Sequence, residues 1–424
     1  MDKQDPKYQQ YVQILEEELI PAMGCTEPIA IAYAGARVRE LLGECPEKLL
    51  VHASGNLIKN VKSVVVPNTG GLKGIEAAAA AGVVAGDARR KLEVISDVSE
   101  ENRAGISAYL EEKEIRVDHL ESDIPFDLIV EAFSEGHHAK IRIAQYHTNI
   151  VFEEKDGQVL LEQELLHEDE GLTDHMSLAV RDIVDFANTV ELSDVRDVIQ
   201  RQIQYNTAIA EEGLRDPWGA SVGRVLLNMY GDDIKTRAKA KAAAGSDARM
   251  SGCELPVVIN SGSGNQGITV CVPVVEYARE LGADEEKTYR AVVLANLLAN
   301  HQKSRIGRLS AYCGAVSAGS AAGAAICYLY GGDYKAIAHC LVNALAITSG
   351  MICDGAKPSC AAKISLSIEA GLLGFEMYRS GTQFRDGEGI VSKGIENTIV
   401  NVGRLGRDGM KGTDLEILKI MTRQ

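Results

Sequence analysis

The sequence predicts an α+β protein with a helix-rich C-terminal lobe, and three observations support this fold class. From about Thr173 onward the apolar spacing is that of helices separated by Gly-rich loops, whereas residues 114–161 alternate as β-strands do. The first third mixes both patterns. We therefore predict an N-terminal α+β part over residues 1–110, a small antiparallel-sheet insert over residues 111–166, and a helical part over residues 167–424.

The N-terminal part contains clear helix signals. Two helices are expected within Pro6–Leu42, with Pro28 in the first turn of the second helix and Gly43 as its stop. Residues 49–66 carry two short β-rich pieces around the polar segment SGNLIKN, which is expected to be a turn. Residues 75–85 are Ala-rich and predict a helix that packs closely on its neighbours.

The predicted sheet consists of the segments DLIVEAF, AKIRIAQY, TNIVFEE and QVLLEQE, together with the run that begins at Glu114. The turn-like segments SEGHH and KDG separate them, which is typical of an antiparallel meander. The sheet contains no Cys, and His137, His138 and His147 lack a metal-binding spacing. A packing or assembly role is expected for it.

Composition and charge exclude several classes of protein. The 424 residues include 44 Lys and Arg against 60 Asp and Glu, a net charge of −16, which repels nucleic acid and anionic membranes. The start of the chain is polar and acidic, unlike a signal or transit peptide. The apolar run Ala311–Tyr330 is mostly Ala, Gly and Ser, which suits helix packing inside a protein. We expect a soluble, cytoplasmic protein with no nucleic-acid and no membrane partner.

The nine cysteines are the most informative residues. An odd number without an export signal does not predict disulfides. Four cysteines fall at or near expected helix starts, where unpaired N–H groups stabilise thiolates and anionic cofactors: Cys25, Cys313, Cys353 and Cys360. Three others fall within apolar runs, helical for two and β-rich (ITVCVPV) for the third, and are expected in the core: Cys327, Cys340 and Cys271. The spacing of the first four matches no ferredoxin or zinc pattern, so the residues alone leave metal ligands and core thiols open.

Two polar, Gly-rich loops are candidates for holding a small molecule. In SGSGNQG, backbone N–H groups can face a carboxylate; the loop has neither a Walker ending nor a dinucleotide fingerprint, and a plain tight turn is the alternative. SGNLIKN and PNTGG offer amide and hydroxyl groups, although local turn chemistry explains them equally well. The predicted binding residues are Asn56, Asn60, Asn68, Thr69, Ser261, Gly262, Ser263, Gly264 and Asn265.

Several segments together resemble the L-cysteine desulfidases, long known as an uncharacterised protein family. They are EEELIPAMGCTEPIAIAYAGA, SGNLIKNVKSVVVPNTGGLKG, GSGNQG, YCGAVSAGSAAGAA and SGMICDGAKPSCAAK, which lie between Glu16 and Ser367. More distantly, the chain is similar to the α-chain of iron–sulfur L-serine dehydratases. The resemblance implies a serine-dehydratase-α-like C-terminal domain that is the catalytic lobe, an oxygen-sensitive [4Fe–4S] cluster, and no pyridoxal phosphate.

The resemblance also assigns cluster ligands. Cys25, Cys313 and Cys353 match the ligands proposed for the desulfidases, and Cys360 matches a ligand position of the serine dehydratases. The separation in CDGAKPSC is shorter than in the dehydratases, so either Cys25 or Cys360 can complete the set. The dehydratases also have a C-terminal Cys tail, which the ending LEILKIMTRQ does not contain.

A cluster held by three thiolates leaves one iron open as a Lewis acid, and a base near neutrality must then take the Cα proton. The candidate bases are His52, Lys59, His301, Lys303 and Lys357. Lys303 is favoured because it lies ten residues before Cys313; His301 and Lys59 follow it. A solvated or structural role is the alternative for each.

The predicted function is the conversion of L-cysteine to pyruvate, ammonia and sulfide. L-Cysteine is preferred over L-serine because a thiol is the softer iron ligand and leaves more easily than a hydroxyl. The alternatives are an L-serine dehydratase, a pyridoxal-phosphate lyase, and a non-catalytic protein that binds a metal or an amino acid. The expected partners are a small amino-acid substrate and further copies of the chain in a homo-oligomer.

Overall fold

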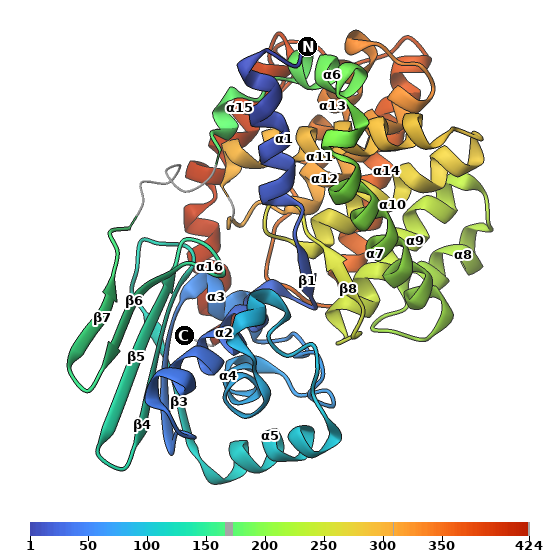
Figure 1. Ribbon diagram of the computed structural model, residues 1–424. Coiled ribbons are helices and arrows are strands. Elements are labelled where there is room, and N and C mark those ends of the chain that lie inside the picture. Colours follow the sequence, from blue (N-terminus) through green and yellow to red (C-terminus); the bar gives the residue numbers. More distant parts are fainter. Residues whose placement is uncertain (166–172, 308, 423–424) are drawn as a thin grey trace.

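The computed structural model describes residues 1–165, 173–307 and 309–422. A helical lobe stands above a sheet that is backed by helices, and the N-terminus lies in the helical lobe (Figure 1). The α+β fold class and the helix-rich C-terminal lobe are confirmed. The division into three parts stays a prediction, and its boundary at 166/167 lies outside the described residues.

The N-terminal helices lie where the sequence placed them. Gly43 ends the second helix in the left-handed region, with φ 89°, and Pro28 lies in its first turn. The elements of this part are α1 (Pro6–Glu18), β1 (Pro21–Met23), α2 (Thr26–Leu42), β2 (Lys48–Ser54), α3 (Gly55–Val61), α4 (Gly74–Ala85), η1 (Ala88–Glu93) and α5 (Glu100–Glu112). The prediction of a turn over SGNLIKN was wrong. These residues form α3, which is held by packing against α2 and the C-terminal helix α16 (Lys411–Thr422), contacts that local sequence does not reveal.

The main sheet has six strands in the order β3-β2-β4-β5-β6-β7. Its further strands are β3 (Glu114–Leu120), β4 (Asp127–Ser134), β5 (His137–Ala144), β6 (Ile150–Lys155) and β7 (Gln158–Glu162). The antiparallel meander is confirmed from β4 to β7. It was wrong for β3, which pairs in parallel with β2. Helices α3 to α5 lie between β2 and β3 in the chain and supply the crossover that a parallel pair requires.

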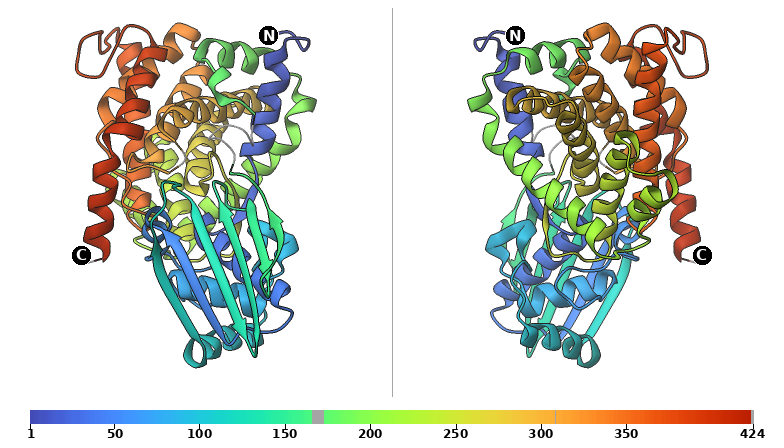
Figure 2. Two further views of the ribbon diagram at one scale, coloured as in Figure 1. Left: turned by 90° about the vertical axis from the view of Figure 1, so that its left-hand side faces the viewer. Right: turned by 90° about the vertical axis from the view of Figure 1, so that its right-hand side faces the viewer.

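Helices α2 and α4 cover one face of this sheet, which faces the viewer in the left-hand view of Figure 2 with the helices behind it. The two helices touch through glycine. A Cβ on Gly82 would lie 1.9 Å from the carbonyl oxygen of Ala32, and one on Gly35 would lie 2.6 Å from that of Ala79. The Ala-rich sequence of α4 therefore reflects backbone-to-backbone packing.

The C-terminal lobe is built around buried, small-residue helices. Its elements are η2 (His175–Ser177), α6 (Val180–Thr189), η3 (Leu192–Asp194), α7 (Arg196–Arg215), α8 (Val222–Tyr230), α9 (Ile234–Met250), β8 (Pro256–Val258), α10 (Gly264–Glu280), α11 (Glu285–Ile306), α12 (Gly314–Leu329), α13 (Tyr334–Thr348), α14 (Cys360–Arg379), α15 (Ile395–Arg404), η4 (Leu405–Gly409) and α16. Gly319 and Gly323 of α12 meet Ser367 and Gly371 of α14 so closely that no Cβ fits. None of the helices in the described ranges combines the length and apolar character needed to cross a membrane.

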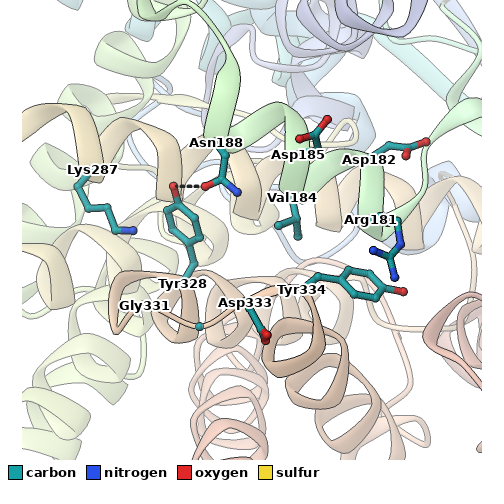
Figure 3. Close-up of a pocket in the computed structure, with 11 residues that line it drawn as sticks. Arg181, Asp182, Val184, Asp185, Asn188, Lys287, Tyr328, Gly331, Asp333 and Tyr334 are labelled. Carbon is teal, nitrogen blue, oxygen red and sulfur yellow. Dashed lines mark hydrogen bonds between the residues drawn. The ribbon is translucent and has the colours of Figure 1, made fainter. Parts of the chain in front are cut away.

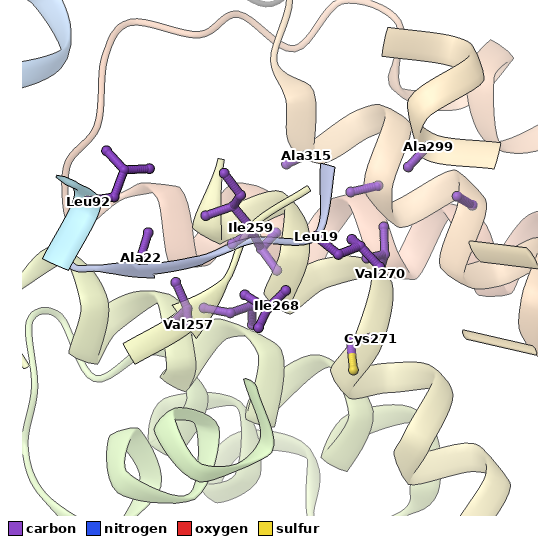
Figure 4. Close-up of a cluster of buried hydrophobic side chains, with 14 of the residues drawn as sticks. Leu19, Ala22, Leu92, Val257, Ile259, Ile268, Val270, Cys271, Ala299 and Ala315 are labelled. Carbon is purple, nitrogen blue, oxygen red and sulfur yellow. The ribbon is translucent and has the colours of Figure 1, made fainter. Parts of the chain in front are cut away.

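A two-stranded sheet joins the N-terminal segment to this lobe. β1 pairs antiparallel with β8, and Ala22 and Val257 face the same buried cluster as Ile268 of α10 (Figure 4). The segment ITVCVPV was predicted to be β-rich, which was wrong: it lies inside α10, and Pro273 is accommodated there. The helix is buried on nearly all sides, so its β-branched apolar residues follow the composition of a buried strand. Cys271 is in the core, as expected.

Candidate functional site

Three cysteine thiols converge where α12 and α14 begin. Cys313 is the N-cap of α12, Cys360 is the first residue of α14, and Cys353 lies in the loop before it. Two backbone hydrogen bonds clamp the segments together: Cys313 N–H donates to the Met351 carbonyl at 3.1 Å, and Cys353 N–H donates to the Ala311 carbonyl at 2.6 Å. Segments 40 residues apart in the chain are thus joined at the cysteines themselves.

The three thiols influence one another electrostatically. Burial raises the pKa of Cys313 to about 12, and Cys353 and Cys360 add repulsion, while Lys363 opposes the rise. Burial also raises the pKa of Cys360, again with a contribution from Cys353. Three buried thiolates therefore need a strongly cationic partner that bonds to sulfur.

This donor set fits an iron–sulfur cluster better than a single ion. Within the described residues, no three His, Cys, Asp or Glu side chains are arranged around one metal position. In a cubane cluster each thiolate bonds to a different iron, so the ligands are spread more widely than around one ion. Thiolates are also the ligands that such clusters use, and Cys313, Cys353 and Cys360 would hold it.

Two lysines lie beside the thiols. Lys363 Nζ donates to the Ile352 carbonyl at 2.7 Å and pairs with Asp354, and Lys357 Nζ lies 2.5 Å from the same carboxylate. Burial disfavours ionisation of Asp354, but the two lysines outweigh it and hold its pKa at about 2. The coupling of Lys363 to Cys313 and Cys353 raises its own pKa against the effect of burial. This charge favours an anionic cluster.

Cys25 approaches the same loop from the N-terminal part but has different partners. It is the N-cap of α2, and it packs with Val64, Met250 and Ala356, the last of which lies between Cys353 and Cys360. Its thiol donates to Glu27 Oε2 at 3.0 Å. Burial and then Glu27 raise the pKa of Cys25 well above its usual range, and Arg249 opposes them.

The SGSGNQG loop contains both features that the sequence left open. Asn260 and Ser263 exchange backbone hydrogen bonds of 3.1 and 3.0 Å around Ser261 and Gly262, whose φ angles are 48° and 77°. Both are positive, as a two-residue type I′ turn requires. Ser263 then caps α10 and Gly264 begins it. The loop is therefore a tight turn that leads directly into a helix start.

This helix start adjoins those of α2 and α12. Thr26 Oγ1 donates to the Gly262 carbonyl at 3.1 Å. Gln266 lies against Gly314, where a Cβ would be only 2.6 Å from Gln266 Cδ. Three N-termini thus face one region, and the buried side-chain oxygens of Asn265 and Gln266 have no partner within the described chain. Unsatisfied buried polar groups of this kind indicate a missing ligand.

The structure brings some predicted binding residues to this region and commits others elsewhere. Asn60 Nδ2 donates to Glu27 Oε1 at 3.2 Å, and Ser261 Oγ donates to Asn300 Oδ1 at 2.6 Å. The side-chain oxygen of Asn56 is buried and unpartnered. Asn68 and Thr69 instead donate to the carbonyls of Ile95 and Val66, both at 2.7 Å, and hold their own loop.

The predicted bases are dispersed. His301 Nε2 lies 2.7 Å from Glu396 of α15, and His52 lies 3.5 Å from Glu131 in the sheet. Lys59 is buried and paired with Asp414 of α16, although its backbone packs on Gly355 of the cysteine loop. Lys303 is buried in the last turn of α11. Their catalytic roles stay predictions.

Sequence reasoning missed three residues that line this region: Glu27, Arg249 and Lys363. Glu27 was within reach, because it stands two positions after Cys25 in the motif AMGCTEP. Arg249 and Lys363 follow Ala-rich or Ser-rich helical runs, and no local signal separates them from surface cations.

A larger cavity lies far from this region. Its volume is about 570 Å³, and it is lined by Arg181, Lys287, Tyr328 and Tyr334 among others (Figure 3). Tyr328 is 15 residues after Cys313 along α12, about 22 Å at 1.5 Å per residue. None of the predicted site residues lines it, so cavity size does not locate the chemistry here.

Comparison with known proteins identifies the family. Residues 89–419 match the serine dehydratase alpha chain family. The chain belongs to this family. The matched range contains Cys313, Cys353 and Cys360, while Cys25 and Glu27 precede it.

Close relatives extend over the whole chain. A UPF0597 protein of Desulfitobacterium hafniense is 56% identical, covering 100% of this chain and 99% of the relative. UPF0597 proteins of Lachnoclostridium phytofermentans and Treponema denticola are 50% and 45% identical, each covering 98% of this chain, and 99% and 98% of the relatives. The name of these relatives states no activity, so membership gives a relation to serine dehydratases and leaves the substrate open.

Proposed function

We propose that the protein is an iron–sulfur lyase that converts L-cysteine to pyruvate, ammonia and sulfide. The observation that carries this proposal is the meeting of three buried thiols with the starts of α2, α10 and α12. The family relation supports a lyase that acts on a small amino acid. A [4Fe–4S] cluster held by Cys313, Cys353 and Cys360 would supply a Lewis-acidic iron to the β-substituent of the substrate.

The chain supplies the proton transfer. Cys25 and Glu27 share one proton across the 3.0 Å hydrogen bond, and passing that proton to Glu27 turns the thiol into a thiolate base. The thiolate takes the Cα proton of the substrate, the Cα electrons form a double bond to Cβ, and the C–S bond breaks with loss of HS⁻. The resulting aminoacrylate tautomerises to an imine, which water hydrolyses to pyruvate and ammonia.

The β-substituent decides between the two candidate substrates. L-Cysteine and L-serine share the amine, the carboxylate and the Cα proton, so only the leaving group differs. A thiol has a reference pKa of about 8.5 and leaves as HS⁻ without prior protonation, whereas hydroxide is a far poorer leaving group. We therefore propose L-cysteine as the substrate and place the C–S bond toward the soft thiolate-ligated iron.

The test is turnover by anaerobically reconstituted protein without added pyridoxal phosphate. Sulfide, ammonia and pyruvate should form in equal amounts from L-cysteine, with a higher kcat/KM than for L-serine. A higher kcat/KM for L-serine on the same preparation would make the protein a serine dehydratase, the function that the family name favours. Binding without turnover of either amino acid would contradict the lyase.

The homo-oligomer also stays a proposal. An exposed apolar groove lined by Ile347, Leu366 and Leu373 supports it, because a monomer rarely exposes such a surface. Mass determination in solution tests it.

A further inference from the structure

Arg249, the penultimate residue of α9, is a buried cation without a partner. Its side chain is 2% exposed, and its Nε has no hydrogen-bond acceptor. Within the described chain no carboxylate forms an ion pair with it. The nearby Asp247 is committed elsewhere, because it accepts from the backbone N–H of Val222 at 2.6 Å and of Ala220 at 3.3 Å. An unpaired buried guanidinium destabilises a fold, so a protein retains one where a ligand supplies the anion.

The guanidinium lies against the start of α10. A Cβ on Gly264 would be 2.3 Å from Arg249 Nε and 2.8 Å from its Cζ, so glycine is required at this position to leave room for the cation. α10 has 17 residues, and the N–H groups of its first turn, at Gly264, Asn265 and Gln266, have no acceptor within the helix. The positive end of a helix and an unpaired guanidinium therefore point to the same anion position.

The position of Arg249 relative to the other groups fits a small amino acid. On one side the charge of Arg249 acts on the thiol of Cys25, with Glu27 as the next carboxylate beyond it. On the other side, Gln266 leads from the start of α10 to Gly314, the residue after Cys313. A carboxylate held at Arg249 thus places its neighbouring carbon beside Cys25 and the following carbon toward the thiols.

We infer that Arg249, together with the first turn of α10, binds the α-carboxylate of the substrate. The identity of that substrate as an amino acid rests on the proposed function, but the carboxylate site itself does not. The planar guanidinium offers two parallel N–H donors to a carboxylate, and the helix start completes the pocket.

The experiment measures binding of L-alanine and of L-alaninamide by calorimetry, under anaerobic conditions. L-Alanine has the amine and carboxylate but no leaving group, and the amide replaces the carboxylate by a neutral group. The wild-type protein should bind L-alanine at least about tenfold more tightly than the amide. Arg249→Gln should weaken L-alanine to the level of the amide and leave the amide unchanged. The control is Arg237→Gln on the same helix, which pairs with Glu280 at the surface and should bind as the wild type does.

Thermal unfolding separates this role from a structural one. Because Arg249→Gln removes an unpaired buried charge, the variant should unfold at the same or a higher temperature than the wild type, and L-alanine should raise the Tm of the wild type alone. A lower Tm with equal weakening of both ligands would show a structural residue. Retained preference for L-alanine in Arg249→Gln, or no L-alanine binding by the wild type, would overturn the inference. Failure to release sulfide from L-cysteine would refute the proposed reaction and leave the carboxylate site standing.

Discussion

The two ends of α12 carry two cysteines that burial alone does not distinguish. Cys313 at the N-terminal end is 8% exposed and Cys327 in the last turns is 1% exposed. Cys313 has Cys353, Cys360 and Lys363 within electrostatic reach. Cys327 contacts Cys340, whose pKa is raised first by the hydrogen bond between the two thiols and then by burial. The role of a buried cysteine is therefore set by what other elements bring to it.

The surroundings of the two ends differ in the same way. At the N-terminal end, loops from three parts of the chain leave buried polar atoms unpaired. At the C-terminal end, Gly332 packs so closely on Cys327 that a Cβ would lie 2.4 Å from Sγ, and its N–H donates to the Cys327 carbonyl at 2.9 Å. One end is prepared for a ligand and the other is complete as packed.

The largest expected effect tests whether only the N-terminal end binds iron. Cys313→Ala, Cys353→Ala and Cys360→Ala should each lower the iron content after anaerobic reconstitution by at least about tenfold, because even loss of a group that merely supports a ligand costs that much. Blue-region absorbance and iron and sulfide analysis measure it. The matched control is Cys327→Ala, which should keep its iron. Equal iron in all four variants would remove the distinction between the two ends.

The placement of these cysteines could be predicted, but their partners could not. Gly314 and the Ala-rich run after Cys313, and Pro358 before Cys360, are local signals that fix where helices start. The meeting of Cys313 with Cys353 depends on a backbone bridge between Tyr312 and Ile352, which no local pattern encodes. The sequence therefore left the third ligand open, whereas in the structure Cys360 couples to the other two thiols and Cys25 couples to Glu27.

The fold shows the same limit. Helices bounded by Pro and Gly, such as α2, were predicted closely, since their caps are local. α10 was not, because a helix buried on nearly all sides loses the polar face that gives helical periodicity. β3 was misplaced because its parallel pairing with β2 is set by tertiary contacts. Arg249 was invisible for a related reason, as its missing partner is a property of the folded surroundings.

A smaller effect should distinguish Cys25 from the thiols at the start of α12. Cys25→Ala should keep its iron but lower kcat by about 10²–10⁴-fold, the usual contribution of a general base. Glu27→Gln should also slow the reaction near pH 7, since the thiol can no longer pass its proton to a carboxylate.

The pH profile of Glu27→Gln gives the sign. Burial keeps the pKa of Cys25 high, while loss of the Glu27 charge lowers it from its wild-type value. The thiolate then forms only as the pH rises, so log kcat/KM should climb with a slope near one between about pH 7 and pH 10. Loss of iron in Cys25→Ala would instead make Cys25 a ligand, and a Glu27→Gln profile parallel to that of the wild type would exclude the shared proton.

The smallest effect concerns the C-terminal end of α12. Cys327→Ala should cost about 1–2 kcal/mol of unfolding free energy, because the sulfur fills the space between Gly332 and Cys340, and its loss leaves a small cavity in a close-packed core. Urea unfolding of the iron-free protein measures this cost. Cys313→Ala in the same iron-free state is the comparison. It removes a buried thiol next to two others, so it should cost less than Cys327→Ala. The opposite order would mean that the N-terminal end is packed as a core and not prepared for a ligand.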